Sequence, residues 1–292
     1  MQPLISVLLS LGAFSAVGLG SPVWKRQDKT PVDEGTYENL SFYAGFPIIS
    51  SVLAGGECPS PSNGVESITY IDVNETDTQA ALWKSVDREE IIVGIPGTAS
   101  GDDLQNDLDF KLVPFDTPNV DCAECQVHSG FLIAWNSLYP LLSKELTAAL
   151  DANPGYSTVI SGHSLGGGIA TLAFASLFNG PFDVTSTYTY GQSRVGNPEF
   201  AAYIDSLSGA SDTEAGTFFR VTHANDGIPI LPPRIFGYEH SRTEYWESAE
   251  VADVATTYQC YGTEPGDCIN TQIGLGPNPA HGSYAGMDVT CG

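Results

Sequence analysis

The residues best suited to covalent chemistry lie near the middle of the chain, in the run Gly162-His-Ser-Leu-Gly166. Residues 157–161 predict a short buried strand before it, and residues 165–178 predict an apolar helix after it. A serine between two such elements sits on a tight, strained turn, where flanking glycines relieve the crowding. The first amides of the helix then face any anion that forms beside the hydroxyl. The pattern predicts that Ser164 is a nucleophile; an ordinary strand-to-helix corner is the alternative.

A nucleophilic serine needs an imidazole to accept its proton, and the imidazole needs a partner that fixes its tautomer. The chain offers five histidines, which are His128, His163, His223, His240 and His281. When this serine pattern occurs in an α/β-hydrolase, the acid and then the histidine follow the serine along the chain. That order favours His281, in a late loop after Asn278-Pro-Ala, but on this argument the other histidines remain open.

The four aspartates that follow the serine most closely are the candidates for orienting the base: Asp183, Asp205, Asp212 and Asp226. Asp226 comes directly after the apolar run 217–222, which predicts a strand, and before a Gly-Ile-Pro turn. This position puts its carboxylate at the same edge of the sheet as Ser164. We expect the other three to be solvated residues of loops or of a helix surface, so Asp226 is the predicted acid.

The oxyanion of an acyl-transfer intermediate needs preorganised N–H donors, each contributing about 3–4 kcal/mol to lowering the barrier. The backbone N–H of Leu165, directly after the nucleophile, is one expected donor. A second is expected after an earlier strand, and Gly97-Thr98, which ends the run 90–95, fits that place. Thr98 is therefore the second predicted oxyanion residue.

The remaining elements alternate in a way that predicts a single α/β domain over residues 27–292. We expect a helix over 37–53 that is interrupted at Pro47, and strands over 67–73, 80–86, 90–95 and 185–190. Helices are expected over 131–149, with Pro140 marking a kink or the true start, and over 198–207, capped by Asn197. Strands alternating with helices predict a mainly parallel central sheet covered by helices on both faces.

The N-terminus indicates export. Residues 1–20 have the apolar core and small residues of a signal peptide, and residues 21–26, which end in Lys25-Arg26, resemble a short pro-segment.

The formal charge of the chain is −24, and removal of Lys25 and Arg26 gives −26. Such a charge repels nucleic acid and anionic lipid surfaces. The apolar stretch 159–178 contains His163 and three glycines, so a buried strand and helix explain it better than a stable membrane insertion.

The cysteine count agrees with an extracellular protein. Six cysteines lie in the predicted mature part, and an even count behind a signal peptide predicts three disulfides, for which 15 pairings exist. No second Cys-x-x-Cys accompanies Cys122-Ala-Glu-Cys125, so the sequence indicates neither a metal site nor a cofactor. Asn39 and Asn74 begin N-glycosylation sequons. We expect a secreted monomer.

With these motifs in place, the sequence resembles the fungal class 3 lipase family, and within it the type-A feruloyl esterase branch. The likeness rests on Gly162-His-Ser-Leu-Gly166, on Phe219-Arg-Val-Thr-His-Ala-Asn-Asp-Gly-Ile-Pro229, and on Asn278-Pro-Ala-His281 with Tyr284. Val113-Pro-Phe-Asp-Thr117 with Cys122, Cys125 and His128 adds a fourth stretch. The resemblance covers the chain from about Tyr37 to its end, and it implies an α/β-hydrolase fold.

The resemblance also implies site residues. It assigns the nucleophile to Ser164, the acid to Asp226, the base to His281, and the oxyanion donors to Thr98 and Leu165. It implies three disulfides, which are Cys58–Cys291, Cys122–Cys125 and Cys260–Cys268; the first would stiffen the loop that carries the base. Pro96 replaces an arginine that is usual in the family before the oxyanion residue. Phe110 takes the substrate-binding position at which those feruloyl esterases carry a tyrosine.

In lipases of this family an amphipathic helix covers the site, and its apolar face meets the oil surface. Here the matching segment, residues 99–109, carries four acids and only two large apolar residues, Leu104 and Leu108. We therefore predict a serine carboxylic-ester hydrolase that acts on small-molecule or lipid esters, prefers soluble or short-chain ones, and lacks strong interfacial activation. The alternatives are a triacylglycerol lipase with weak interfacial activation and a non-catalytic secreted binding protein on the same fold.

Overall fold

The structure is a computed structural model that describes residues 29–53, 58, 60–97 and 110–291. The predicted signal peptide and pro-segment, Thr98 and the segment 99–109 lie outside these residues. Within them, nine strands form one sheet in the order β1-β11-β10-β9-β8-β7-β4-β3-β2, and β5 and β6 form a separate pair.

The strands of the main sheet are β1 (Thr30–Pro31), β2 (Glu66–Val73), β3 (Thr78–Ser85), β4 (Glu90–Ile95), β7 (Ser157–His163), β8 (Val184–Tyr190), β9 (Phe218–His223), β10 (Glu244–Glu247) and β11 (Thr257–Cys260). The small pair is β5 (Leu112–Pro114) and β6 (Gln126–His128). The helices are α1 (Glu34–Val52), α3 (Ser129–Ala152), α4 (Leu165–Phe178) and α5 (Pro198–Ser208). Short 3-10 turns follow at η2 (Arg234–Phe236), η3 (Val254–Thr256), η4 (Ile269–Thr271) and η5 (Pro279–Gly282).

The centre of the sheet is parallel and its two edges are antiparallel. Strands β4, β7, β8, β9 and β10 pair in parallel, whereas β2 and β3 at one edge and β1 and β11 at the other pair antiparallel. The carboxyl ends of the parallel strands therefore meet at one edge of the sheet, where folds of this kind place their ligands. The expected α/β-hydrolase architecture with a mainly parallel centre is confirmed.

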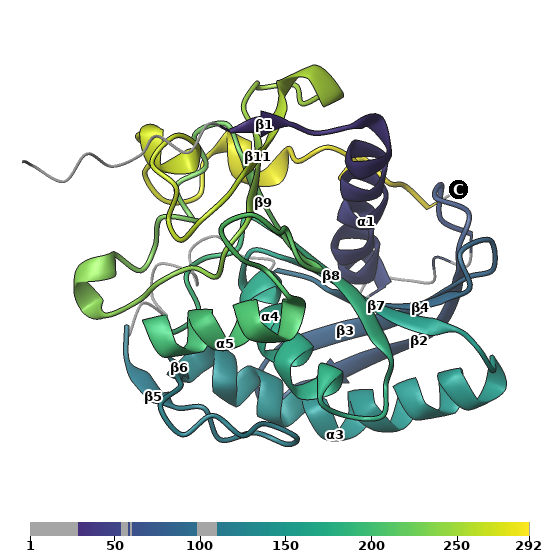
Figure 1. Cartoon of the computed structure of the whole chain (residues 1–292). Helices are drawn as coiled ribbons and strands as arrows, with labels where there is room; N and C mark the ends of the chain where they lie inside the picture. Colours follow the sequence, from purple (N-terminus) through teal and green to yellow (C-terminus); the bar gives the residue numbers. More distant parts are fainter. Residues whose placement is uncertain (1–28, 54–57, 59, 98–109, 292) are drawn as a thin grey trace, which may run out of the picture.

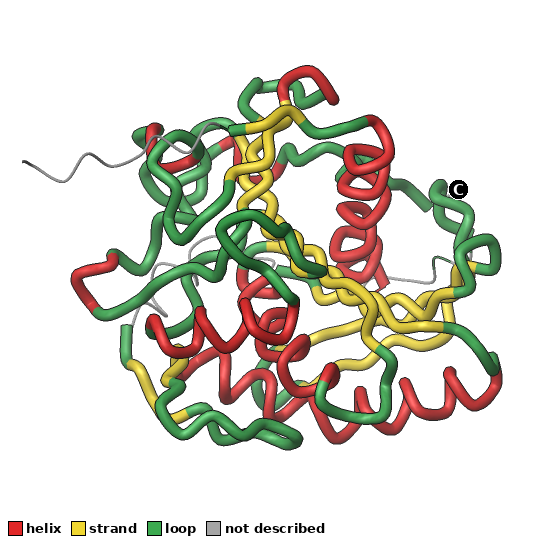
Figure 2. Tube along the Cα trace, in the orientation of Figure 1, coloured by secondary structure: helices red, strands yellow, loops and turns green. Residues whose placement is uncertain are grey.

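Helices cover both faces of the sheet, as predicted (Figures 1 and 2). Ile92 and Val159 belong to the core beneath α1, while the next residues, Val93 and Ile160, belong to the core on the side of α3, α4 and α5. This alternation follows from the two-residue repeat of a strand. Central strands that are buried on both faces have continuous apolar sequences, and for this reason they could be predicted from the sequence.

Two prolines interrupt the helices less than expected. Helix α1 runs through Pro47, so the predicted break is wrong, and α3 begins at Ser129 and runs through Pro140. A proline inside a helix costs about 3 kcal/mol. In α1 that cost is offset by burial of Leu40, Phe46 and Ile49 against the sheet.

One strand and one buried acid were not predicted. Strand β10, with the sequence Glu-Tyr-Trp-Glu, is buried along its whole length although it carries two acids. Asp205 was expected to be solvated, but only 6% of it is exposed, because it accepts hydrogen bonds from the backbone N–H and the guanidinium of Arg242. For Asp205 a distant partner makes burial of the carboxylate tolerable, and local sequence does not reveal such a partner.

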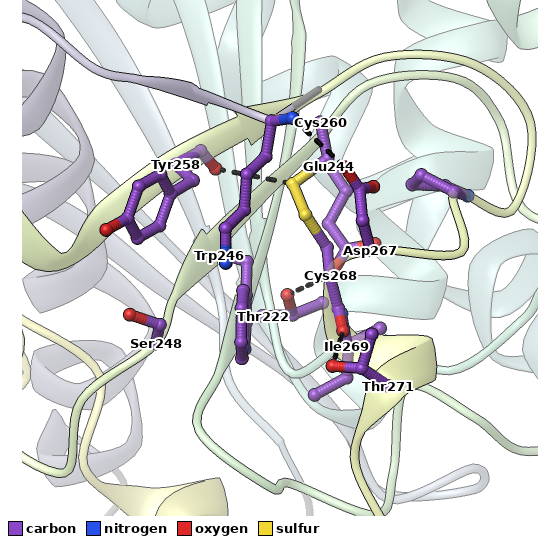
Figure 3. The surroundings of a disulfide bond; sticks show 12 residues. Thr222, Glu244, Trp246, Ser248, Tyr258, Cys260, Asp267, Cys268, Ile269 and Thr271 are labelled. Carbon is purple, nitrogen blue, oxygen red and sulfur yellow. Dashed lines mark hydrogen bonds between the residues drawn. A yellow bond between two sulfur atoms is a disulfide. The ribbon is translucent and has the colours of Figure 1, made fainter. Parts of the chain in front are cut away.

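The six cysteines form the three disulfides that the resemblance implied, Cys58–Cys291, Cys122–Cys125 and Cys260–Cys268. Figure 3 shows the last of these beside Glu244, Trp246 and Tyr258, so it joins the end of β11 to the segment that follows. Cys58–Cys291 links residues 233 positions apart and fastens the C-terminal tail to the segment after α1.

Candidate active site

The predicted nucleophile lies on the turn between β7 and α4. Ser164 has φ 56° and ψ −122°, a backbone conformation that non-glycine residues rarely adopt. The turn is tight enough that a Cβ on Gly166 would lie 2.3 Å from the carbonyl oxygen of Ile95, so only glycine fits there. The strained serine and its glycine neighbour agree with the turn predicted from the sequence.

The turn, the late loop and the segment after β9 bring three side chains together. His281 Nε2 lies 2.8 Å from Ser164 Oγ, and His281 Nδ1 lies 2.9 Å from Asp226 Oδ2. The three residues are 117 and 55 positions apart along the chain, so the fold alone assembles them. Ser164 is 6% exposed and the Asp226 side chain is fully buried, whereas the His281 side chain keeps 13% exposure.

Asp226 is held by two further donors. The backbone N–H of Ile228 donates to Oδ1 at 2.9 Å, and the hydroxyl of Tyr284 donates to Oδ2 at 2.6 Å. Burial, together with the neighbouring Asp226 carboxylate, raises the pKa of Tyr284 well above its ordinary value, so this hydroxyl keeps its proton and donates a hydrogen bond to the carboxylate. The acid therefore has a fixed orientation toward the imidazole. The sequence reasoning named Tyr284 but assigned it no role.

Gly191, at the end of β8, makes room for the base. It has φ +59°, and a Cβ there would lie 2.9 Å from the His281 ring and 3.1 Å from Asp226 Oδ2. Because that distance is shorter than any ordinary carbon contact, a side chain at this position would displace the imidazole. The sequence reasoning missed this glycine, since nothing local distinguishes it from other loop glycines.

The expected anion site is described in part. Leu165, whose N–H is the first expected oxyanion donor, is the first residue of α4. Thr98, the second expected donor, lies outside the described residues. The preceding residue, Gly97, is close to the nucleophile, since a Cβ on it would lie 3.1 Å from Ser164 Cβ. The end of β4 is thus next to the serine, as the parallel pairing of β4 with β7 requires.

The other predicted residues take no part in this line of hydrogen bonds. The Phe110 ring packs 5.3 Å from the ring of Phe236, which is 53% exposed. Asn74 is exposed in the turn between β2 and β3, and the side-chain oxygen of Asn39 accepts a hydrogen bond from Arg88.

In the part of the chain that the structure describes, no cluster of three or more His, Cys, Asp or Glu could hold a metal ion. None of the helices described there combines the length and apolar character that a bilayer-spanning segment requires.

Comparison with known proteins agrees with this geometry. Residues 92–236 match the family model described as lipase (class 3). The chain is 34% identical over 266 residues to secreted mono- and diacylglycerol lipase 1 of Fusarium solani, covering 88% of this chain and 74% of that protein. The chain belongs to the class 3 lipase family. It is therefore a carboxylic-ester hydrolase by family, which confirms the coarser part of the resemblance.

Two further relatives are similar to this class 3 lipase. Secreted mono- and diacylglycerol lipase A of Penicillium cyclopium is 32% identical over 205 residues, which cover 69% of this chain and 63% of that protein. The crystal structure of Lip2 lipase from Yarrowia lipolytica superposes with a TM-score of 0.82 at 24% identity, covering 91% of this chain and 98% of that one, and so supports the fold. The Fusarium and Penicillium relatives are named as secreted, in agreement with the predicted export. None of the three is a feruloyl esterase by name.

Proposed function

We propose that this class 3 lipase is a secreted serine hydrolase. It cleaves mono- and diacylglycerols and other esters that are soluble or have short acyl chains. The observation that carries the proposal is the unbroken line of hydrogen bonds from Ser164 Oγ through the His281 ring to Asp226. The substrate class is taken from the relatives that are named as mono- and diacylglycerol lipases.

The geometry supports a two-step reaction. Ser164 Oγ attacks the ester carbonyl carbon while His281 Nε2 takes its proton, and the leaving alcohol then receives that proton from the imidazolium. Water then attacks the acyl-enzyme while His281 takes its proton, and the imidazolium returns that proton to Ser164 Oγ as the bond to the acyl group breaks and the acid is released. Asp226, which lies 2.9 Å from His281 Nδ1, orients the ring and stabilises the imidazolium at each step. The N–H of Leu165, with Thr98, would hold the negative oxygen of both tetrahedral intermediates.

Phe110 bears on the choice between lipid and phenolic esters. Its ring contacts the half-exposed ring of Phe236, and neither side chain carries a hydroxyl that could bind a phenol. The pair offers apolar surface to an acyl chain but no hydrogen bond to the phenolic hydroxyl of a feruloyl group. This supports the lipase-like substrate class over the feruloyl esterase branch.

The test is an assay of p-nitrophenyl esters of rising chain length, glycerol mono- and diesters, and methyl ferulate, with Ser164→Ala as the control. We expect the highest kcat/KM on the short-chain p-nitrophenyl esters and on the glycerol mono- and diesters, and little activity on methyl ferulate. The variant should hydrolyse none of these esters. Unchanged activity in Ser164→Ala would refute the mechanism. A sharp rise in rate when a substrate passes its solubility limit would instead favour a triacylglycerol lipase with interfacial activation. A folded wild-type protein that hydrolyses none of these esters would favour a non-catalytic binding protein.

A further inference from the structure

The histidine directly before the nucleophile contacts the backbone of the base. His163 Nε2 lies 2.8 Å from the carbonyl oxygen of His281. The rings of the two histidines are 4.7 Å apart between centroids, with 36° between their planes. The side chain of His163 thus leaves the nucleophile turn toward the backbone and ring of His281.

The direction of this hydrogen bond follows from its acceptor. A carbonyl oxygen can only accept, so Nε2 of His163 must carry the proton. Burial lowers the pKa of His163 to about 4, with a smaller contribution from the nearby His281, so the ring is neutral at ordinary assay pH. A neutral imidazole has one N–H, and here that N–H points at the backbone of His281.

The turn that carries the base is also held at its other residues, since His223 Nδ1 lies 3.0 Å from the carbonyl oxygen of Ala280. His281 belongs to η5, a single 3-10 turn, and the next two residues, Gly282 and Ser283, are exposed. The Asn278 side chain donates to the carbonyl of Asn225 at 2.8 Å, which fixes the start of the turn. The bond from His163 is at the catalytic residue itself, and it joins the base to β7, the strand that ends at the nucleophile.

We propose that His163 is a positioning residue, which fixes the distance between base and nucleophile by donating its Nε2–H to the carbonyl oxygen of His281. The inference rests on the proposed function, since it concerns the same reaction. The serine is held by the turn after β7, and the base is tied to the last residue of β7. Movement of the η5 turn relative to the serine therefore has to break this hydrogen bond.

The test compares three variants of the full secreted protein. His163→Phe keeps a ring but removes the N–H, whereas His163→Gln keeps an N–H at a similar distance from the backbone. Ser161→Ala is the matched control, because Ser161 lies on the same strand and its buried hydroxyl also donates to a carbonyl, that of Tyr43 at 2.7 Å, on α1 rather than on the base loop. The measurements are kcat and KM on a soluble p-nitrophenyl ester, the melting temperature, and the downfield proton NMR signal of His281 Nδ1–H.

We expect kcat of His163→Phe to fall about tenfold to hundredfold, since a misplacement of the order of 1 Å can cost that much. KM should change little, the His281 proton signal should shift or broaden, and His163→Gln should recover most of kcat. Ser161→Ala should melt at a lower temperature with kcat unchanged. Wild-type kcat and proton signal in folded His163→Phe, equal losses in the phenylalanine and glutamine variants, or an equal loss in Ser161→Ala would each overturn the proposal. Activity that survives Ser164→Ala would refute the proposed function instead. In that case a shift of the His281 Nδ1–H signal in His163→Phe would still show that His163 positions the imidazole.

Discussion

Replacing Glu247 by glutamine keeps the shape of a buried side chain and removes its charge, and we expect this change to stabilise the protein above about pH 5. Glu247 is fully buried at the end of β10. Its Oε2 accepts one long hydrogen bond, 3.3 Å from the N–H of Ala285, and its Oε1 has no partner among the residues described. A carboxylate in such a place is poorly compensated.

The size of the effect follows from the pKa. Burial raises the pKa of Glu247 from 4.5 to about 8. Between these values the folded protein keeps a proton that the unfolded chain has released, so the free energy of unfolding falls as pH rises through this window. The loss is about 1.4 kcal/mol per pH unit, hence about 2.7 kcal/mol between pH 5 and pH 7. For a protein of this size that corresponds to roughly 5–10 °C in melting temperature.

The assay is the melting temperature of wild type and Glu247→Gln at pH 5, 6, 7 and 8. The advantage of the variant should widen by roughly 5–10 °C between pH 5 and pH 7. Glu244→Gln is the contrasting control on the same strand, because Glu244 accepts from Thr222 and Ile269 and lies 3.8 Å from the buried guanidinium of Arg220. Its loss leaves that cation unpaired and should destabilise by about 3–5 kcal/mol. Parallel melting curves for Glu247→Gln and wild type would show that Glu247 is already ionised in the fold, and would refute the reasoning.

Three other changes test the site and its support. Tyr284→Phe removes a donor to the triad acid and should lower kcat about tenfold with KM unchanged, as steady-state kinetics would show; a wild-type kcat would mean that the hydroxyl has no part in orienting the acid. Gly191→Ala places a methyl group 2.9 Å from the His281 ring and should lower kcat about a hundredfold or more, and full activity would contradict the packing described. Replacing Cys58 and Cys291 together by alanine should cost about 2–5 kcal/mol in denaturant unfolding, and an unchanged midpoint would show that this disulfide contributes nothing to stability.

The sequence predicted well where local chemistry is sufficient. Helix α4 has the predicted bounds, Leu165–Phe178, because a glycine-rich turn starts it and an uninterrupted apolar run fills it. The cap of α5 is Asn197, which accepts from the N–H of Phe200 as expected. Chain order and the resemblance also selected His281 and Asp226, and the fold brings both to Ser164.

What the sequence did not predict depends on partners that are far away in the chain. Strand β10 is short and carries two acids, so no two-residue repeat marks it; its place in the sheet depends on pairing with β9 and β11. The burial of Asp205 depends on Arg242, 37 residues later. The contact of His163 with His281 spans 118 residues. Spacing within one element carries no information on such pairs.

The position of the base has a consequence for when the protein becomes active. His281 follows Ser164 by 117 residues, and the segment beyond it is fastened by the disulfide between Cys58 and Cys291, which forms only under oxidising conditions. Until the chain has been synthesised as far as His281 and that loop has folded, Ser164 has no imidazole held beside it. The order of the polypeptide thus delays ester cleavage until the late loop has folded against the turn that carries the serine.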